Sequence, residues 1–168
     1  MQKVLFLLAI VGLFTASCTK SSDPAPATQT RTQLIAKTWQ MQTASATLNS
    51  NNFSVPVYAK GGTGNLLDYS KYQLTLGSDG KSSLFDGTTT RTGTWQLATN
   101  DTQLVITYPD NTKVTYTVDG ASATNLDLSY QIDPATKDAS EQALLAQGRS
   151  LNFDVSKGIK ITTKLIPQ

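Results

Sequence analysis

The dominant pattern in this chain is an alternation of apolar and polar residues in short runs. The cleanest run is residues 125–132, in which every second side chain is large and apolar. Since successive side chains of a strand point to opposite faces of a sheet, such a run predicts a strand with one buried face. Similar runs predict further strands at residues 38–48, 53–59, 72–76, 81–85, 89–97, 103–108, 112–119, 151–155 and 159–165.

The segments between these runs are short and rich in turn residues. Asp79 and Gly80, placed between two alternating runs, predict a β-hairpin over residues 72–85. Pro56 has no amide hydrogen for a sheet ladder, which predicts an edge strand or a bulge at that point. Short links favour an antiparallel meander, and a long meander hides its edges best by closing into a barrel. We therefore predict an all-β barrel of about eight to ten strands, with a β-sandwich as the alternative fold.

One helix is expected near the C-terminus. Residues 139–147 are rich in Ala, Leu, Glu and Gln, which are good helix formers. Asp133 is a candidate N-cap, Pro134 suits the first helical position, and Gly148 can end the helix. Residues 33–37 are expected to form either a helical turn or a lead-in to the first strand.

The first eighteen residues have the features of an export signal. A basic start is followed by an apolar run at residues 4–14 and by three small residues immediately before Cys18. The apolar run is shorter than the roughly 20 residues that a membrane span needs, so residues 1–17 are predicted to be a signal peptide. A cysteine at this position resembles a bacterial lipoprotein signal, in which Cys18 becomes the lipid-modified first residue and attaches the protein to a membrane.

Residues 18–32 are polar and contain Pro24 and Pro26. Such a segment cannot bury enough apolar area to offset its ordering entropy, so it is predicted to be a disordered linker. The folded domain is then residues 33–168. The expected location is outside the cytoplasm, anchored by lipid to the outer membrane on its periplasmic side or at the cell surface.

The composition argues against several kinds of catalytic and metal-binding site. The chain has no histidine, one cysteine, and Glu141 as its single glutamate. Ser-His-Asp triads and His metal ligands are therefore absent, and lipidation of Cys18 leaves no thiol nucleophile. Five aspartates fall in predicted turns, where they cap backbone amides: Asp79, Asp86, Asp101, Asp110 and Asp119. The net charge is only +2, without the basic patch that nucleic-acid binding needs. We predict no enzyme activity, no catalytic residue, no metal site, no cofactor and no nucleic-acid partner.

A set of aromatic and apolar side chains falls on the inward faces of the predicted strands. Two interpretations stay open, because a barrel of about eight strands can be filled by its side chains or can hold one small ligand. In the second case these residues line the pocket, and the loops at residues 61–64 and 87–90 frame its mouth. The candidate pocket residues are Trp39, Met41, Tyr72, Trp95, Tyr116, Tyr130 and Phe153.

The order of these features resembles that of the bacterial lipocalin-like lipoproteins of Bacteroidota type. Cys18 and a polar linker precede Lys37-Thr38-Trp39, and the hairpin at residues 72–85 precedes Gly93-Thr94-Trp95. The Gly-x-Trp motif of lipocalins is intact at Trp95, while Lys37 replaces its glycine at Trp39. The resemblance implies an up-and-down β-barrel whose interior can hold a small apolar ligand.

Two functions follow from these observations. The first is a membrane-anchored, lipocalin-like lipoprotein that binds a small hydrophobic ligand in its barrel. The alternative is a structural or interaction lipoprotein of the cell envelope, with a filled barrel and no ligand. A hollow interior would favour the first and a filled interior the second.

Overall fold

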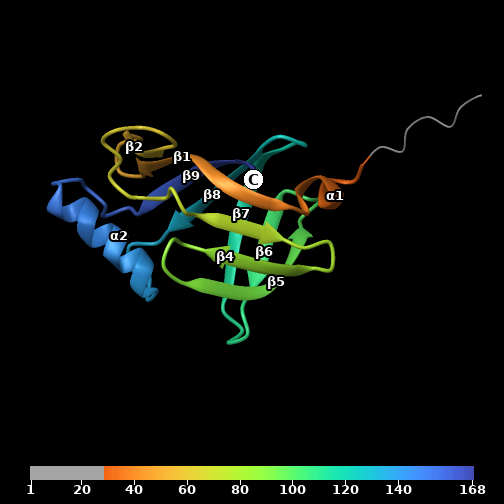
Figure 1. Ribbon diagram of the computed structural model, residues 1–168. Coiled ribbons are helices and arrows are strands. Elements are labelled where there is room, and N and C mark those ends of the chain that lie inside the picture. The colour runs from red at the N-terminus through yellow and green to blue at the C-terminus, as the bar shows by residue number, and fades with distance from the viewer. Residues whose placement is uncertain (1–28) are drawn as a thin grey trace, which may run out of the picture.

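The computed structural model describes residues 29–168, so the predicted signal peptide, Cys18 and most of the predicted linker lie outside the described residues. The described part contains nine strands and two helices (Figure 1). The helices are α1 (Arg31–Ile35) and α2 (Ala139–Ser150). The strands are β1 (Thr38–Leu48), β2 (Ser54–Ala59), β3 (Gln73–Leu76), β4 (Lys81–Phe85), β5 (Thr90–Ala98), β6 (Gln103–Thr107), β7 (Lys113–Ala121), β8 (Leu126–Ile132) and β9 (Ile159–Pro167).

The strands form one antiparallel sheet that closes on itself. From β3 to β9 each strand pairs with its neighbours in chain order, and β1 pairs with both β3 and β9. Eight strands therefore make a closed up-and-down barrel, with β2 as an additional strand on β1. This confirms the predicted meander and barrel, and the β-sandwich alternative is wrong. The predicted hairpin is confirmed as β3 and β4, which pair from Gln73 opposite Phe85 to Leu76 opposite Ser82.

One edge of β1 is divided between two strands. β9 pairs with β1 along its whole length, from Trp39 to Leu48, whereas β3 covers only Thr38 to Gln40 on the other edge. β2 covers the second half of that edge, and its register shifts opposite Ala44 and Ser45. The expectation of an edge strand with a bulge near Pro56 is thus confirmed. The barrel wall consequently parts between β2 and β3.

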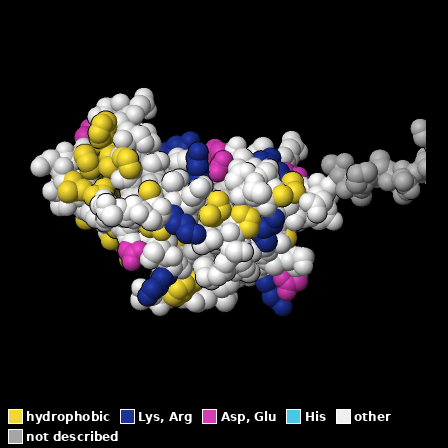
Figure 2. Space-filling view, turned by 45° about the horizontal axis from the view of Figure 1, so that its top comes forward, with side chains coloured by type: hydrophobic (Ala, Val, Ile, Leu, Met, Phe, Trp, Pro, Cys, Tyr) yellow, Lys and Arg dark blue, Asp and Glu magenta, His cyan; other side chains and the backbone are white. Residues whose placement is uncertain are grey.

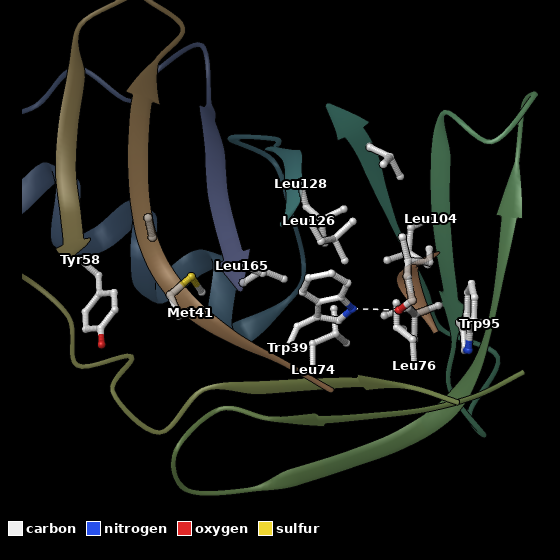
Figure 3. Close-up of a cluster of buried hydrophobic side chains, with 14 of the residues drawn as sticks. Trp39, Met41, Tyr58, Leu74, Leu76, Trp95, Leu104, Leu126, Leu128 and Leu165 are labelled. Carbon is white, nitrogen blue, oxygen red and sulfur yellow. Dashed lines mark hydrogen bonds between the residues drawn. The ribbon is translucent and has the colours of Figure 1, made fainter. Parts of the chain in front are cut away.

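The end of the barrel beside α1 is filled. Thr30 and Gln33 form a capping box, in which Thr30 Oγ1 accepts from the Gln33 amide at 3.2 Å and Gln33 Oε1 accepts from the Thr30 amide at 2.9 Å. The helix turns Ile35 into the barrel, where the buried Trp39 donates from Nε1 to the Ile35 carbonyl at 2.8 Å (Figure 3). The leucines around Trp39 are at most 1% exposed, so they pack this half of the barrel; they are Leu74, Leu76, Leu104, Leu126, Leu128 and Leu165. The N-cap Thr30 and the first residues of α1 come before residue 33, the predicted start of the folded domain.

The start of α2 differs from the prediction. Asp138, not Asp133, is the capping residue, since its Oδ1 accepts from the Glu141 amide at 3.0 Å. Asp133 instead accepts from the Ala135 amide at 2.7 Å in a separate turn before the helix. In the part of the chain that the structure describes, no helix is long and apolar enough to cross a membrane.

The end of α2 also differs from the prediction, because Gly148 lies inside the helix. The amide of Phe153 donates to the Gly148 carbonyl at 3.0 Å and that of Asn152 to the Arg149 carbonyl at 3.0 Å, with Asn152 at φ 60°. These are the two bonds of a Schellman motif. The predicted strand at residues 151–155 is therefore wrong: its apolar residues belong to a helix C-terminus, whose chain reversal is incompatible with a sheet ladder.

Gly158 holds the loop after α2 against the ends of β1 and β8. Its carbonyl accepts from the Asn49 amide at 3.1 Å, its φ is +81°, and an added Cβ would meet the Ile132 carbonyl oxygen at 2.3 Å. Gly61 has a similar φ of +76° but open space around it. Alanine variants at these two positions therefore differ in one respect. Both place a side chain at a positive φ, and only the variant at Gly158 adds a steric clash.

We expect Gly158→Ala to lower the free energy of unfolding by more than Gly61→Ala. The positive φ costs about 1–2 kcal/mol in either variant, and the displaced backbone adds about 1–3 kcal/mol in Gly158→Ala. Urea denaturation followed by tryptophan fluorescence measures both. Equal losses in the two variants would contradict the close approach at Gly158.

Candidate functional site

The half of the barrel away from α1 contains a cavity of about 370 Å³. Its wall is made by the second half of β1, by β2, by the loop between β2 and β3, and by β7, β8 and β9, with α2 lying against its mouth. Aliphatic side chains line much of the wall: Val55, Val57, Leu84, Val114, Ile159 and Ile161. The barrel thus has a filled half and a hollow half.

A β-bulge in β1 creates the hollow half. Met41 pairs with Leu165 and Thr43 with Lys164, so Gln42 is an extra residue on β1. Before the bulge, odd-numbered side chains such as Trp39 and Met41 point inward. After it Ala44 and Ala46 point inward and line the cavity. Two methyl groups therefore stand where the strand could have placed bulky side chains.

Tyrosines make the polar part of the cavity wall. Five of them line it, from the loop before β3 and from β6, β7 and β8: Tyr69, Tyr72, Tyr108, Tyr116 and Tyr130. Four of these rings pack edge to face in pairs, with centroids 5.5 Å apart for Tyr116 and Tyr130 and 6.0 Å apart for Tyr69 and Tyr72. This packing fixes the rings, so the hydroxyl groups have defined positions.

The tyrosine hydroxyls have no hydrogen-bond partner among the residues that the structure describes. The most extreme case is Tyr108, which is 5% exposed and whose hydroxyl oxygen is fully buried. Buried hydroxyls without a partner are costly, because they lose their bonds to water and gain none. The hydroxyls of this set that open onto the cavity are available to a ligand.

Burial raises the pKa values of these tyrosines. The effect is large for Tyr72, Tyr116 and Tyr130, because the low-dielectric surroundings disfavour the phenolate and because neighbouring phenols add to it. Burial also raises the pKa of Tyr108, although the nearby Arg91 guanidinium works against the shift. All five groups are therefore neutral at physiological pH and can donate hydrogen bonds.

Arg91 is the cation of the cavity. It lies on β5 opposite Leu84, is solvent-exposed, and its guanidinium carbon stands 3.9 Å from the centroid of the Tyr108 ring. This is a cation–π contact with a fixed geometry. Among the described residues no carboxylate forms an ion pair with Arg91. The carboxylate of Asp110 lies within electrostatic range of Arg91 without forming an ion pair with it.

Three acidic residues also line the cavity, and each has a structural role. Asp86 accepts from the amides of Thr88 and Thr89, both at 2.8 Å, and these bonds lower the pKa of its carboxyl group. Glu141 accepts from Thr136 Oγ1, and Asp138 caps α2. These carboxylates are engaged in holding the loop after β4 and the start of α2.

Apolar side chains surround the mouth. Leu66 and Leu151 line the cavity and remain 44% and 46% exposed. Nearby Phe53 is 53% exposed and packs on Phe153, with ring centroids 6.2 Å apart. Figure 2 shows apolar side chains gathered at this end of the molecule, away from the N-terminal end. Large exposed apolar residues that cluster at a cavity mouth are typical of a binding surface.

The structure brings together most of the residues predicted to form a pocket. Met41, Tyr72, Tyr116, Tyr130 and Phe153 line the cavity. Whether they bind a ligand stays a prediction.

The two tryptophans of the predicted pocket do not line the cavity. Trp39 and Trp95 are buried in the filled half, where each indole donates to a backbone carbonyl, that of Ile35 at 2.8 Å and that of Gly77 at 2.9 Å. The prediction that they line a pocket is wrong, because a side chain that points inward can lie in either half of the barrel.

Sequence reasoning missed other lining residues. It did not single out Ala44 and Ala46, since the bulge at Gln42 reverses the inward face of β1. It also missed Arg91, which is charged but on the inward face of β5. The signal for the bulge is present in the chain, because two polar residues, Gln42 and Thr43, interrupt the alternation.

The aspartates in predicted turns serve the backbone there. Asp79 accepts from the Lys81 amide at 3.1 Å and Asp110 from the Thr112 amide at 2.9 Å, and these bonds lower both carboxyl pKa values. Asp119 differs, since it lies within β7 beside a register shift rather than in a turn. Within residues 29–168, no three His, Cys, Asp or Glu side chains stand close enough to hold a metal ion.

A comparison with solved structures finds a similar protein. A lipocalin-like protein from Bacteroides uniformis has a solved structure with 14% sequence identity and a TM-score of 0.43, and the match covers 80% of this chain and 99% of that one. No protein-family model and no curated protein matches the chain. The eight-stranded, up-and-down barrel closed between β1 and β9 is itself the lipocalin-like architecture.

The buried tyrosines predict a loss of stability in alkali. A phenol whose pKa is raised by folding stabilises the native state only below the pKa of the unfolded chain, about 10. As the pH rises above that value, the unfolded state ionises first, and each such tyrosine removes up to about 1.4 kcal/mol per pH unit. We expect the free energy of unfolding to fall from about pH 10 upward.

The triple variant Tyr72→Phe, Tyr116→Phe, Tyr130→Phe should show a flatter dependence over this pH range. Urea denaturation at several pH values measures the slope, and the wild-type chain is the reference because both contain the same lysines. An unchanged slope in the variant would mean that these phenols titrate normally.

Proposed function

We propose that this protein is an exported, lipid-anchored binding protein that holds a small, largely apolar ligand in the hollow half of its barrel. In this proposal Cys18 carries the lipid, and the protein sits at the outer membrane, on its periplasmic side or at the cell surface. Ligand binding and membrane attachment depend on different regions of the chain, the barrel and Cys18.

The cavity supports the ligand-binding part. Its volume of about 370 Å³ falls within the range of roughly 300–1,000 Å³ that is usual for small-molecule sites. Protein interiors are otherwise close-packed, with few voids larger than a water molecule. An interior void of this size, lined by aliphatic and aromatic side chains, is unfavourable for stability, and ligand binding explains why the chain keeps it.

We favour binding over catalysis. The acidic side chains at the cavity, Asp86, Asp138 and Glu141, bond to the protein's own amides or hydroxyl groups. General acid–base chemistry needs groups with tuned pKa values that face a substrate. The proposal therefore includes no enzymatic step, no cofactor and no nucleic-acid partner.

A neutral apolar probe tests the ligand-binding part. We expect N-phenyl-1-naphthylamine to bind the domain at residues 29–168 with a rise in fluorescence, because its two aromatic groups fit an apolar cavity. Ala46→Trp puts an indole into the cavity and should weaken probe binding more than tenfold. Gln96→Trp, an exposed position on β5, adds the same side chain outside and should leave binding unchanged.

Circular dichroism and urea denaturation check that both tryptophan variants are folded. Failure of the probe to bind the wild-type domain, or equal binding by Ala46→Trp, would contradict a ligand site in the barrel. That result would favour the alternative function, an envelope lipoprotein that acts through its outer surface.

The attachment part is tested through Cys18, the one cysteine of the chain. We expect the full-length protein to fractionate with membranes and to gain the mass of a lipid after loss of residues 1–17. Cys18→Ser should give a protein in the soluble fraction without that mass. Recovery of the wild-type chain without lipid would overturn this part and leave the ligand-binding part intact.

A further inference from the structure

We propose that the ligand is an amphipathic organic anion, whose acidic head group binds to Arg91 and to tyrosine hydroxyls while its apolar body fills the cavity. This inference rests on the proposed function, because it names the class of ligand for the same site. The polar groups of the cavity wall support it, whereas the volume and the apolar lining of the cavity support the proposed function.

Arg91 gives the site its positive charge. The guanidinium lies over the face of Tyr108, at 3.9 Å from the ring centroid, and this contact holds it at the cavity wall. Stacking uses the face of the guanidinium and leaves its N–H donors free at the edges. A carboxylate, sulfonate or phosphate accepts two of these donors in a bidentate bond, which is the strongest polar contact available to arginine.

The tyrosine hydroxyls extend the polar wall from Arg91 around the barrel. Arg91 lies on β5, Tyr108 directly follows β6, Tyr116 lies on β7 and Tyr130 on β8, so the four residues come from consecutive parts of the sheet. The phenols of Tyr108 and Tyr116 lie within electrostatic range of the Arg91 charge. Neutral phenols with no acceptor in the described protein can donate to the oxygen atoms of an acidic head group.

The acidic residues at the mouth do not make the site a better match for a cation. Asp86 already accepts two amide hydrogen bonds and one from Thr89 Oγ1, and Glu141 accepts from Thr136 Oγ1. Their oxygen atoms are therefore engaged within their own segments, although the charge of Glu141 still acts on the cavity tyrosines Tyr116 and Tyr130. Arg91, in contrast, stacks on an aromatic ring and forms no ion pair within residues 29–168, although Asp110 lies within electrostatic range of it.

Two probes that differ in a single acidic group test the inference. 1-Anilinonaphthalene-8-sulfonate has the aromatic skeleton of N-phenyl-1-naphthylamine plus a sulfonate, so the pair separates the anion from the apolar body. We expect Arg91→Gln to weaken binding of the sulfonate probe about tenfold, which is about 1.4 kcal/mol, and to change binding of the neutral probe less than twofold. The control is Arg149→Gln, which removes a charge from the last turn of α2 at a residue that does not line the cavity.

The paired variant Tyr116→Phe, Tyr130→Phe tests the hydroxyl groups. We expect it to weaken the sulfonate probe several-fold and the neutral probe less than twofold, because the rings and the cavity shape are kept. Loss of sulfonate binding in Ala46→Trp would locate that probe in the cavity.

Three results would overturn the inference. The first is an equal effect of Arg91→Gln on both probes, or no effect on either. The second is an equal loss of sulfonate binding in Arg149→Gln. The third is displacement of the neutral probe by dodecyltrimethylammonium at a lower concentration than by dodecyl sulfate, which would assign the site to cations. Failure of the neutral probe itself to bind is a different result, because it contradicts the proposed function as a whole.

Discussion

The pairing of β1 with β9 is the constraint on which the rest of the structure depends. β9 follows β1 from Trp39 to Leu48, and this contact alone turns a meander into a barrel. Because the two strands stay paired over that length, the extra residue at Gln42 cannot be removed by slipping the register. It is absorbed as a bulge, and the bulge divides the barrel into a half that Trp39 fills and a half that Ala44 and Ala46 leave open.

Much of the fold could be predicted because it depends on local patterns. Alternation located most strands, and Asp79-Gly80 located the β3–β4 hairpin, since both are properties of neighbouring residues. The apolar run at residues 151–155 alternates equally well, yet it forms a helix C-terminus. The left-handed conformation of Asn152 decides that outcome, and alternation contains no information about it.

The candidate site was harder to predict because a cavity depends on the whole barrel. The inward direction of Met41, Tyr72, Tyr116 and Tyr130 follows from alternation, and these residues line the cavity. Trp39 and Trp95 follow the same rule but pack in the filled half. Which inward residues face a void is set by the length of β3, by the bulge in β1 and by the place of α2, and none of these is visible in a single strand.

The two ends of the barrel are distinct, and the chain joins the barrel at the filled end. Helices α1 and α2 lie at opposite ends of the barrel (Figure 1). The capping box of α1 and the indole of Trp39 close the first end, whereas residues of α2 line the cavity at the other. If Cys18 carries a lipid, the protein is attached to a bilayer on the side of its filled end. On the proposed lipid anchor, the attachment side and the mouth therefore belong to opposite ends of the barrel, so a ligand reaches the cavity without passing the attached end.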